Sequence, residues 1–120
     1  MTSKQFLIIC RRAPYGESYA REALDVAMAA AAFDQRIAML FLGDGVAQLF
    51  TRQDSAALEQ KSLEKQLSAL PLYDVNEIYV DNEALAERGV NANELSLPAK
   101  ALDRDAIATL IARADIALNF

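Results

Sequence analysis

Short apolar runs separated by helix-length segments constrain the fold of this chain more than any other feature. Residues 6–10 form a continuous apolar run rich in β-branched side chains, and residues 37–42 form a second. Continuous runs of this kind are typical of strands buried on both faces, as in a parallel sheet with helices on each side. A third strand is predicted over 75–80, where Ile78 to Val80 are the most β-prone residues.

The remaining segments predict helices between the strands, and the alternation predicts the fold class. We expect an α/β fold with three α/β/α layers, about five mostly parallel strands and right-handed crossovers. Two longer helices are expected at 18–33, with Ser18 as N-cap, and at 54–70, with Asp54 or Ser55 as N-cap. Shorter helices are expected at 46–50, at 82–88 with Asp81 or Asn82 as N-cap and Gly89 at the end, and after the N-cap Asp103. The remaining strands are expected at 95–99 and 115–120.

The first predicted helix is apolar on nearly all sides. Ala20, Leu24 and Ala27 belong to one helical face, but Val26 and Ala30 make the other side apolar as well. A helix of this kind is usually covered on more than one side. In a chain this short the sheet can supply one cover, and a second subunit can supply the other.

Composition excludes several classes of function. The 120 residues, 53% of them hydrophobic, fit one domain over 1–120, and a single Cys with no His rules out an internal disulfide, a Ser-His-Asp triad and a His-ligated metal. A net charge of −5 argues against direct nucleic-acid binding. No stretch approaches the ~20 apolar residues of a membrane span, and the first apolar run is too brief for a secretory signal. We therefore expect a cytoplasmic protein without a metal or other cofactor.

Residues that could carry chemistry are expected at the carboxyl ends of the strands, where ligands bind in doubly wound folds. These are the loop 11–17, the turn 43–45, residues 81–83 and the residues after the fourth strand. Arg11 and Arg12, ahead of a helix, could hold an anion, or could face solvent or the acidic groups of a partner. The turn 43–45 could bind a ligand through backbone N–H groups, but a simple chain reversal is favoured.

Cys10 ends the first predicted strand, and its position favours a structural role. Unpaired Cys is among the most buried residue types and packs as a small hydrophobe. A reactive thiolate needs exposure and a nearby cation, and the adjacent Arg11 and Arg12 leave that alternative open.

Several stretches in order along the chain resemble the TusC/DsrF branch of the DsrE/DsrF-like sulfur-relay family. They are 12–16 (Arg-Ala-Pro-Tyr-Gly), 41–46 (Phe-Leu-Gly-Asp-Gly-Val), 72–75 (Leu-Tyr-Asp-Val), 86–90 (Ala-Glu-Arg-Gly-Val) and 114–120. The resemblance implies a flavodoxin-like subunit that assembles with TusD/DsrE-like and TusB/DsrH-like subunits, typically as a dimer of heterotrimers. Such complexes pass persulfide sulfur, either toward 2-thiouridine at the wobble position of tRNA or within sulfur oxidation.

The resemblance also identifies the position at which catalytic relatives carry sulfur. Their sulfur-carrying Cys follows the third strand, and that position corresponds here to about Asp81, which can cap a helix but cannot form a persulfide. The resemblance therefore implies a non-catalytic structural subunit of such a complex, with tRNA 2-thiolation as the favoured pathway. The alternatives are a sulfurtransferase that uses Cys10, a subunit for sulfur oxidation, and, ranked behind these, a flavodoxin- or receiver-like module that binds a nucleotide or phosphoryl group.

Overall fold

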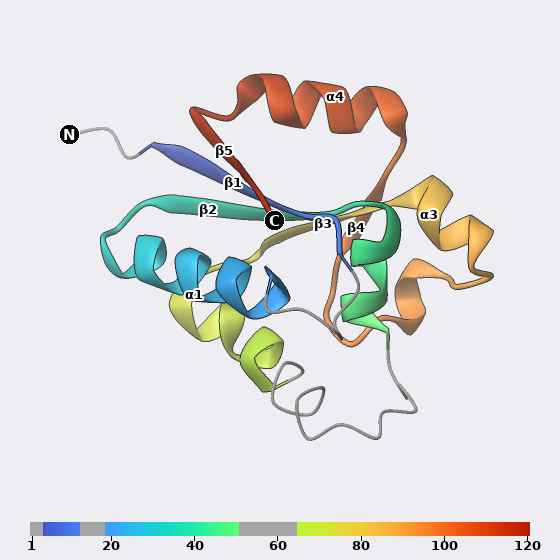
Figure 1. Ribbon diagram of the computed structural model, residues 1–120, viewed down its shortest axis with the longest axis horizontal. Coiled ribbons are helices and arrows are strands. Elements are labelled where there is room, and N and C mark those ends of the chain that lie inside the picture. Colours follow the sequence, from blue (N-terminus) through green and yellow to red (C-terminus); the bar gives the residue numbers. More distant parts are fainter. Residues whose placement is uncertain (1–3, 13–18, 51–64) are drawn as a thin grey trace.

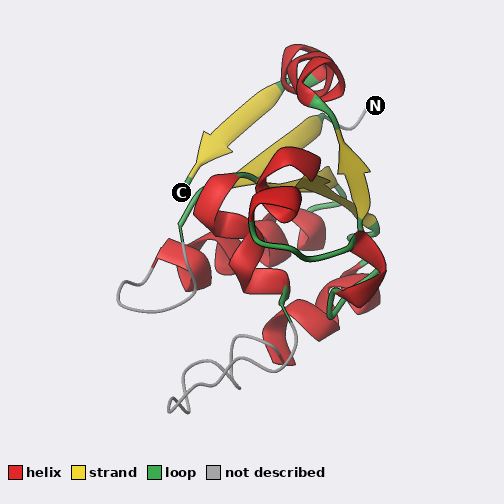
Figure 2. Cartoon of the chain, turned by 90° about the vertical axis from the view of Figure 1, so that its right-hand side faces the viewer, coloured by secondary structure: helices red, strands yellow, loops and turns green. Residues whose placement is uncertain are grey.

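Five parallel strands form a single sheet with helices on both faces in the computed structural model, which describes residues 4–12, 19–50 and 65–120. Figures 1 and 2 show the sheet between its two helical layers. The strands are β1 (Gln5–Cys10), β2 (Arg36–Phe41), β3 (Glu77–Asp81), β4 (Lys100–Leu102) and β5 (Ile116–Asn119). The α-helices with both ends described are α1 (Tyr19–Ala32), α3 (Asn82–Glu87) and α4 (Arg104–Arg113), and residues 65–69 are α-helical as well. The 3-10 helices are η1 (Gly43–Leu49), η2 (Leu70–Tyr73) and η3 (Ala92–Glu94).

The order of the strands in the sheet is β4-β3-β2-β1-β5. The chain therefore steps from β1 to β4 in one direction and then returns across the sheet to place β5 beside β1. Right-handed crossovers in opposite directions put their helices on opposite faces, and Figure 1 shows α1 below the sheet and α4 above it. The predicted three-layer α/β/α class is confirmed and the layers are flavodoxin-like, although flavodoxin itself has the strand order 2-1-3-4-5.

The two faces of the central strands enter two separate cores. Ile8 and Met39 belong to the larger core, together with α1, η1 and α3. Leu7 and Leu40 belong to the smaller core, against which α4 packs its half-buried Ile107, Leu110 and Ile111. Because neighbouring residues of β1 and β2 point to opposite faces and both faces are covered, these strands must be apolar beyond their first residues, Gln5 and Arg36.

Three predicted capping positions are confirmed. The Asp81 carboxylate accepts hydrogen bonds from backbone N–H groups at the start of α3, and Asp103 Oδ1 accepts one from Ala106 N at 2.8 Å at the start of α4. Gly89 follows α3 with a positive φ of 67°, the left-handed conformation that glycine adopts at helix ends. The proposed N-caps Ser18 and Asp54 or Ser55 lie outside the described residues.

The prediction of a fourth strand at 95–99 is wrong. Leu95 makes only an isolated antiparallel bridge with Phe50, and Leu97 is buried in the larger core. The fourth strand is Lys100–Leu102, which pairs with β3. The spacing of the leucines reflects burial in the larger core rather than pairing in the sheet. Pro98 also has no backbone N–H group to donate to a neighbouring strand.

The predicted short helix at 46–50 begins earlier than expected, because Gly43–Gly45 is already its first turn. Gly45 N donates to Leu42 O at 2.8 Å, which brings the Gly45 backbone directly against the end of β1. A Cβ atom at position 45 would overlap the carbonyl oxygen of Cys10. A glycine is therefore required here by a close approach between two backbones.

We expect the Gly45→Ala substitution to lower the free energy of unfolding by about 1–3 kcal/mol, the usual cost of forcing extra volume into a packed site. Gly43→Ala is the matched control, because position 43 has open space around a Cβ but a φ of +52°, a strain of roughly 1 kcal/mol. Urea denaturation of both variants provides the measurement. A Gly45→Ala loss no larger than that of Gly43→Ala would contradict the close approach.

Candidate functional site

The carboxyl ends of all five strands meet at one edge of the sheet, because every strand pair is parallel. The sequence prediction that the loops after the strands gather there is met by the described parts of these loops. Arg11 and Arg12 follow β1, Gly43–Gly45 follows β2, and Asp81 ends β3. Asp103 follows β4, Asn119 ends β5, and Phe120 follows it. The direction of the crossovers reverses between β1 and β5, which is where doubly wound folds form their ligand crevice.

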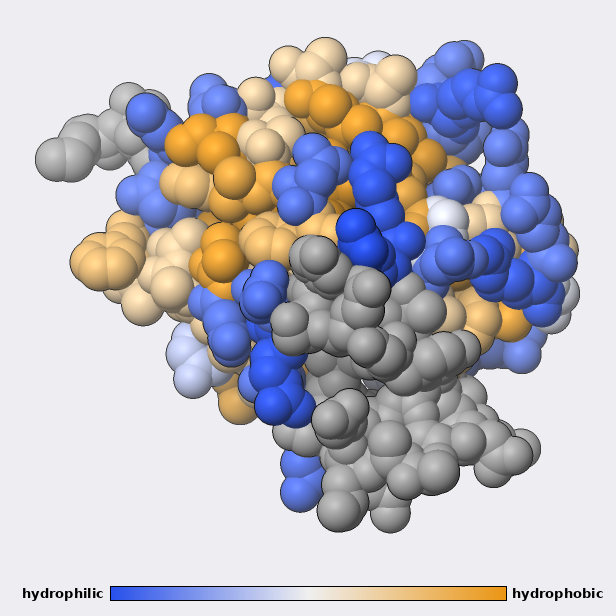
Figure 3. All heavy atoms as spheres, viewed as in Figure 1, coloured by the Kyte–Doolittle hydropathy of each residue, from blue (hydrophilic) through white to orange (hydrophobic). Residues whose placement is uncertain are grey.

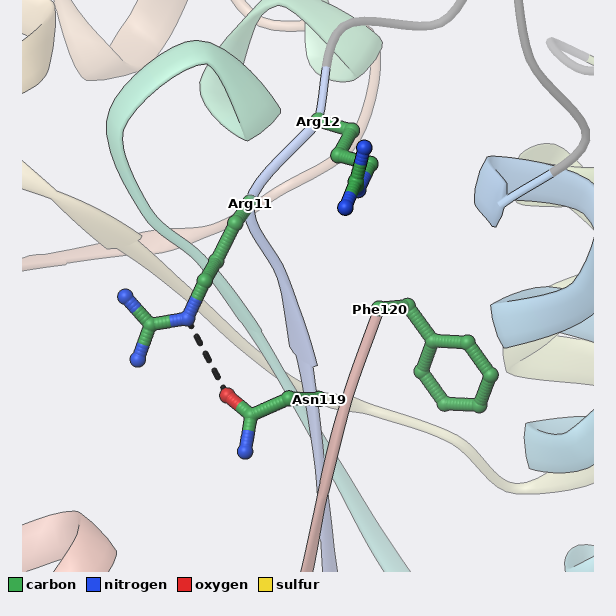
Figure 4. Close-up of a pocket in the computed structure, with 4 residues that line it drawn as sticks. All are labelled: Arg11, Arg12, Asn119 and Phe120. Carbon is green, nitrogen blue, oxygen red and sulfur yellow. Dashed lines mark hydrogen bonds between the residues drawn. The ribbon is translucent and has the colours of Figure 1, made fainter.

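A pocket of about 370 Å³ lies at this point of reversal, and four of the described residues line it: Arg11, Arg12, Asn119 and Phe120. Arg11 Nε donates to Asn119 Oδ1 at 3.0 Å. Backbone bonds hold the two strand ends together, since Arg11 N donates to Phe120 O at 2.9 Å and Phe120 N donates to Ile9 O at 2.8 Å. Figure 4 shows Arg11 beside Asn119, while Arg12 points toward the space above the Phe120 ring.

Gln48 anchors the end of β1 from below. Its side chain is only 5% exposed, and Nε2 donates to the Arg12 carbonyl at 2.9 Å. The Oε1 atom of the same amide is buried and has no hydrogen-bond partner within the described part of the chain. Sequence reasoning missed Gln48 and Asn119, although each is a polar residue inside an otherwise apolar segment, and that pattern could have singled them out.

An ion pair ties α3 to the turn after β2. Arg88 Nη2 lies 2.6 Å from Asp44 Oδ1, and Arg88 Nη1 donates to Ala84 O at 3.0 Å. The Asp44 side chain is largely exposed, so the pair fixes geometry more than it stabilises the fold. The Gly43–Gly45 turn is therefore engaged by neighbouring elements of its own chain.

Asp81 uses its carboxylate to cap α3. Asp81 Oδ1 accepts from Glu83 N at 3.1 Å and from Ala84 N at 3.4 Å. These bonds satisfy backbone donors that the first turn of a helix leaves without partners. The Asp81 carboxylate is thus engaged in capping the start of α3.

Cys10 lies in the larger core and does not line the pocket between β1 and β5. Its side chain is 1% exposed, and burial raises the pKa of the thiol from 9.0 to about 12. A thiol with this pKa is ionised on the order of 10⁻⁵ of the time at pH 7. Arg11 and Arg12 are adjacent in sequence, but both are exposed and their charge does not offset the desolvation of the thiol.

The described residues contain no group of three or more His, Cys, Asp or Glu side chains that could hold a metal ion. Within the same ranges, every helix is too short or too polar to cross a membrane.

Comparison with known proteins places these features in a family. A family model described as the DsrE/DsrF-like family matches residues 4–120. A Pseudomonas aeruginosa protein called "Protein TusC homolog" is 44% identical over 113 residues, covering 94% of this chain and 95% of that protein. The "Intracellular sulfur oxidation protein DsrF" of Allochromatium vinosum is 44% identical over 92 residues, covering 77% of this chain and 68% of that protein.

Among solved structures, the ychN protein from E. coli superposes with a TM-score of 0.82, covering 98% of this chain and 99% of that chain. The identity is 18%, so this likeness shows a shared fold. The match of the family over residues 4–120, together with the two curated relatives, establishes that this chain belongs to the DsrE/DsrF-like family.

Proposed function

We propose that this chain is a non-catalytic structural subunit of a sulfur-relay complex in the cytoplasm. The names of the relatives, TusC homolog and an intracellular sulfur oxidation protein, support a role in sulfur transfer. The observation that carries the non-catalytic role is the state of the chain's single Cys. A sulfur carrier must present a thiolate to a donor and then to an acceptor, and Cys10 is buried with a raised pKa.

The alternative in which the chain is a sulfurtransferase in its own right would depend on that same thiol. The rise of its pKa from 9.0 to about 12 lowers the thiolate fraction about a thousandfold. Access is blocked as well, because the side chain sits in the core formed by β1, β2 and α1. The residue at the start of α3 is Asp81, so no thiol is present at that position. These properties favour a subunit whose partners carry the sulfur.

An apolar surface along α1 and β5 supports assembly with partners, and we call it the α1–β5 surface. Val26, Ala30 and Phe33 have the spacing i, i+4, i+7 that places them on one face of a helix, and Phe33 is 77% exposed. Ile116 and Leu118 of β5 are half-buried, and β5 is an edge strand with one ladder left unpaired. Figure 3 shows apolar residues spread over this side of the molecule.

We propose that the α1–β5 surface receives a partner subunit of the same family, a TusD/DsrE-like or TusB/DsrH-like chain, within a dimer of heterotrimers. Apolar residues are enriched in the buried centre of permanent interfaces. The net charge of −5 supports a complex in which contact with RNA is made by another subunit.

For the pathway, we propose tRNA 2-thiolation as the destination of the sulfur. The TusC homolog aligns over a larger share of this chain than the DsrF protein does, 94% against 77% at equal identity. Sulfur oxidation is the second candidate, because the DsrF relative reaches the same 44% identity.

The first prediction concerns sulfur loading. After incubation with a cysteine desulfurase and ³⁵S-labelled cysteine, we expect no stable, stoichiometric persulfide on the folded chain, because Cys10 is buried and protonated. Non-reducing gels and intact mass measurement detect the label. Iodoacetamide should alkylate folded Cys10 about a thousandfold more slowly than the same thiol in guanidinium chloride.

Cys10→Ala supplies the background for both measurements, since it removes the chain's only thiol. A wild-type chain that acquires one labelled sulfur per molecule, lost in Cys10→Ala, would overturn the non-catalytic role.

The second prediction concerns assembly. We expect Ala29→Arg to reduce co-purification with co-expressed TusD/DsrE-like and TusB/DsrH-like subunits at least tenfold, because it places a charge on the outer side of α1. Ala108→Arg is the matched control, since Ala108 is also an exposed alanine within a helix, but on α4. Native mass spectrometry measures the complex. Equal recovery of both variants would refute the α1–β5 surface, and an unassembled wild-type chain would refute the complex.

The third prediction concerns the pathway. Deleting the gene in its own organism should remove most 2-thiouridine from tRNA hydrolysates analysed by liquid chromatography and mass spectrometry, and the wild-type gene should restore it. Unchanged 2-thiouridine with impaired oxidation of sulfur compounds would instead support the second candidate.

A further inference from the structure

Three large apolar side chains are exposed in the described part of the chain, and all three adjoin one pocket. Phe33 is 77% exposed, Leu72 85% and Tyr73 48%. The pocket has a volume of about 290 Å³, and its lining includes Tyr73, Asp34, which follows Phe33, and Asp74, which follows Tyr73. A single exposed apolar side chain is ordinary, but several gathered around a hollow indicate an interaction surface.

The pocket lies at the amino edge of the sheet, opposite the loops that follow the strands. Arg36 and Glu77, the first residues of β2 and β3, both line it. α1 packs against η2 here, and Figure 1 shows the end of α1 and the turn before β3 together at the left of the molecule. We call Phe33, Leu72 and Tyr73, with the acidic residues of the pocket, the amino-edge patch.

The charge of the pocket favours a cation. Its lining has three carboxylates, Asp34, Asp74 and Glu77, and one guanidinium group, that of Arg36, whose Nη2 lies 3.8 Å from Glu77 Oε2. The carboxylates of Asp34 and Asp74 have no hydrogen bond or ion pair within the described part of the chain. α1 ends beside them and has no basic residue in its last turn, so the negative end of the helix adds to the field.

The apolar residues around the pocket decide which kind of cation fits. The described residues do not form a group of acidic side chains that could hold a metal ion, and a free metal ion would leave Phe33 and Leu72 uncovered. RNA and anionic lipid would be repelled by the carboxylates. An Arg side chain pairs with carboxylates through parallel N–H groups and also stacks on a tyrosine ring such as that of Tyr73.

We infer that the amino-edge patch docks a segment of a partner protein in which an Arg lies between large apolar side chains. The guanidinium group enters the pocket between Asp34 and Asp74, and its apolar neighbours cover Phe33 and Leu72. Arginine and aromatic side chains are the residues enriched at the centres of protein interfaces. The inference does not depend on the sulfur-relay role, and it shares only Phe33 with the α1–β5 surface.

The test is titration of the full chain with the peptide acetyl-Phe-Arg-Leu-Arg-Phe-amide at constant ionic strength. One control peptide has citrulline in place of each Arg, which keeps the shape and removes the charge, and another has Ser in place of each Phe and Leu. Amide chemical shifts report the position of binding and calorimetry its strength. We expect saturable shifts at Asp34, Gln35 and Asp74, and binding at least tenfold tighter than that of either control peptide.

The Asp34→Asn/Asp74→Asn double variant should weaken binding of the peptide at least fivefold. Both positions have a positive φ, 60° and 63°, which Asn tolerates, and thermal unfolding verifies that the variant is folded. Leu72→Ser should weaken binding at least threefold through the apolar contact. Asp105→Asn is the matched control, because it removes an exposed carboxylate from α4 on the opposite face of the sheet, and it should change binding less than twofold.

Four results would each overturn the inference. The first is the absence of saturable binding. Equal binding of the citrulline peptide would show general apolar adhesion, and equal binding of the Ser peptide would show attraction of positive charge alone. A loss with Asp105→Asn as large as that of the double variant would show a response to net charge rather than to the amino-edge patch.

Discussion

The parallel pairing of β1 with β2, buried on both faces, is the constraint on which the rest of the structure depends. Of its six paired positions, the five from Phe6 with Ile37 to Cys10 with Phe41 require apolar residues on both sides. They also bring the two strand ends to the same edge. There Leu42 N donates to Cys10 O at 2.9 Å, and the backbone of Gly45 passes directly over the same carbonyl. The register of this pair thereby fixes the turn after β2, and through Asp44 and Arg88 it also fixes the position of α3.

The parts of the fold that could be predicted from sequence are those determined by residue type and spacing within a short segment. Continuous apolar runs identified β1 and β2, and the capping roles of Asp81 and Asp103 followed from residue type and spacing. The fourth strand was misplaced because Leu95 and Leu97 are apolar for a tertiary reason, the larger core, which a linear pattern cannot separate from strand pairing. The loops that meet at the carboxyl edge followed from the parallel topology. The pairing of Arg11 with Asn119, 108 residues apart, depends on strand order, which the sequence pattern leaves open.

The contrast between Cys10 and Asp81 illustrates how position decides chemistry. A helix N-terminus stabilises negative charge, so a thiol there would be activated, and a carboxylate there becomes a cap. The interior of a buried strand has the opposite effect and disfavours negative charge, because desolvation keeps the thiol of Cys10 protonated. The chain thus has its one thiol where thiolate is disfavoured and a carboxylate where thiolate would be favoured. Moving a thiol between two such positions would change its reactivity with no change of fold.

The order of the strands also has a consequence for how the chain folds during synthesis. From β1 to β4, each new strand adds beside the one made just before it, so the sheet can grow as the chain leaves the ribosome. β5 is the exception, because it must return to β1, and the bond from Gln5 N to Asp115 Oδ2 spans 110 residues. Contacts of such separation form late. The crevice between Arg11 and Phe120 is therefore completed only when β5 pairs with β1, after the other four strands of this sheet have been made.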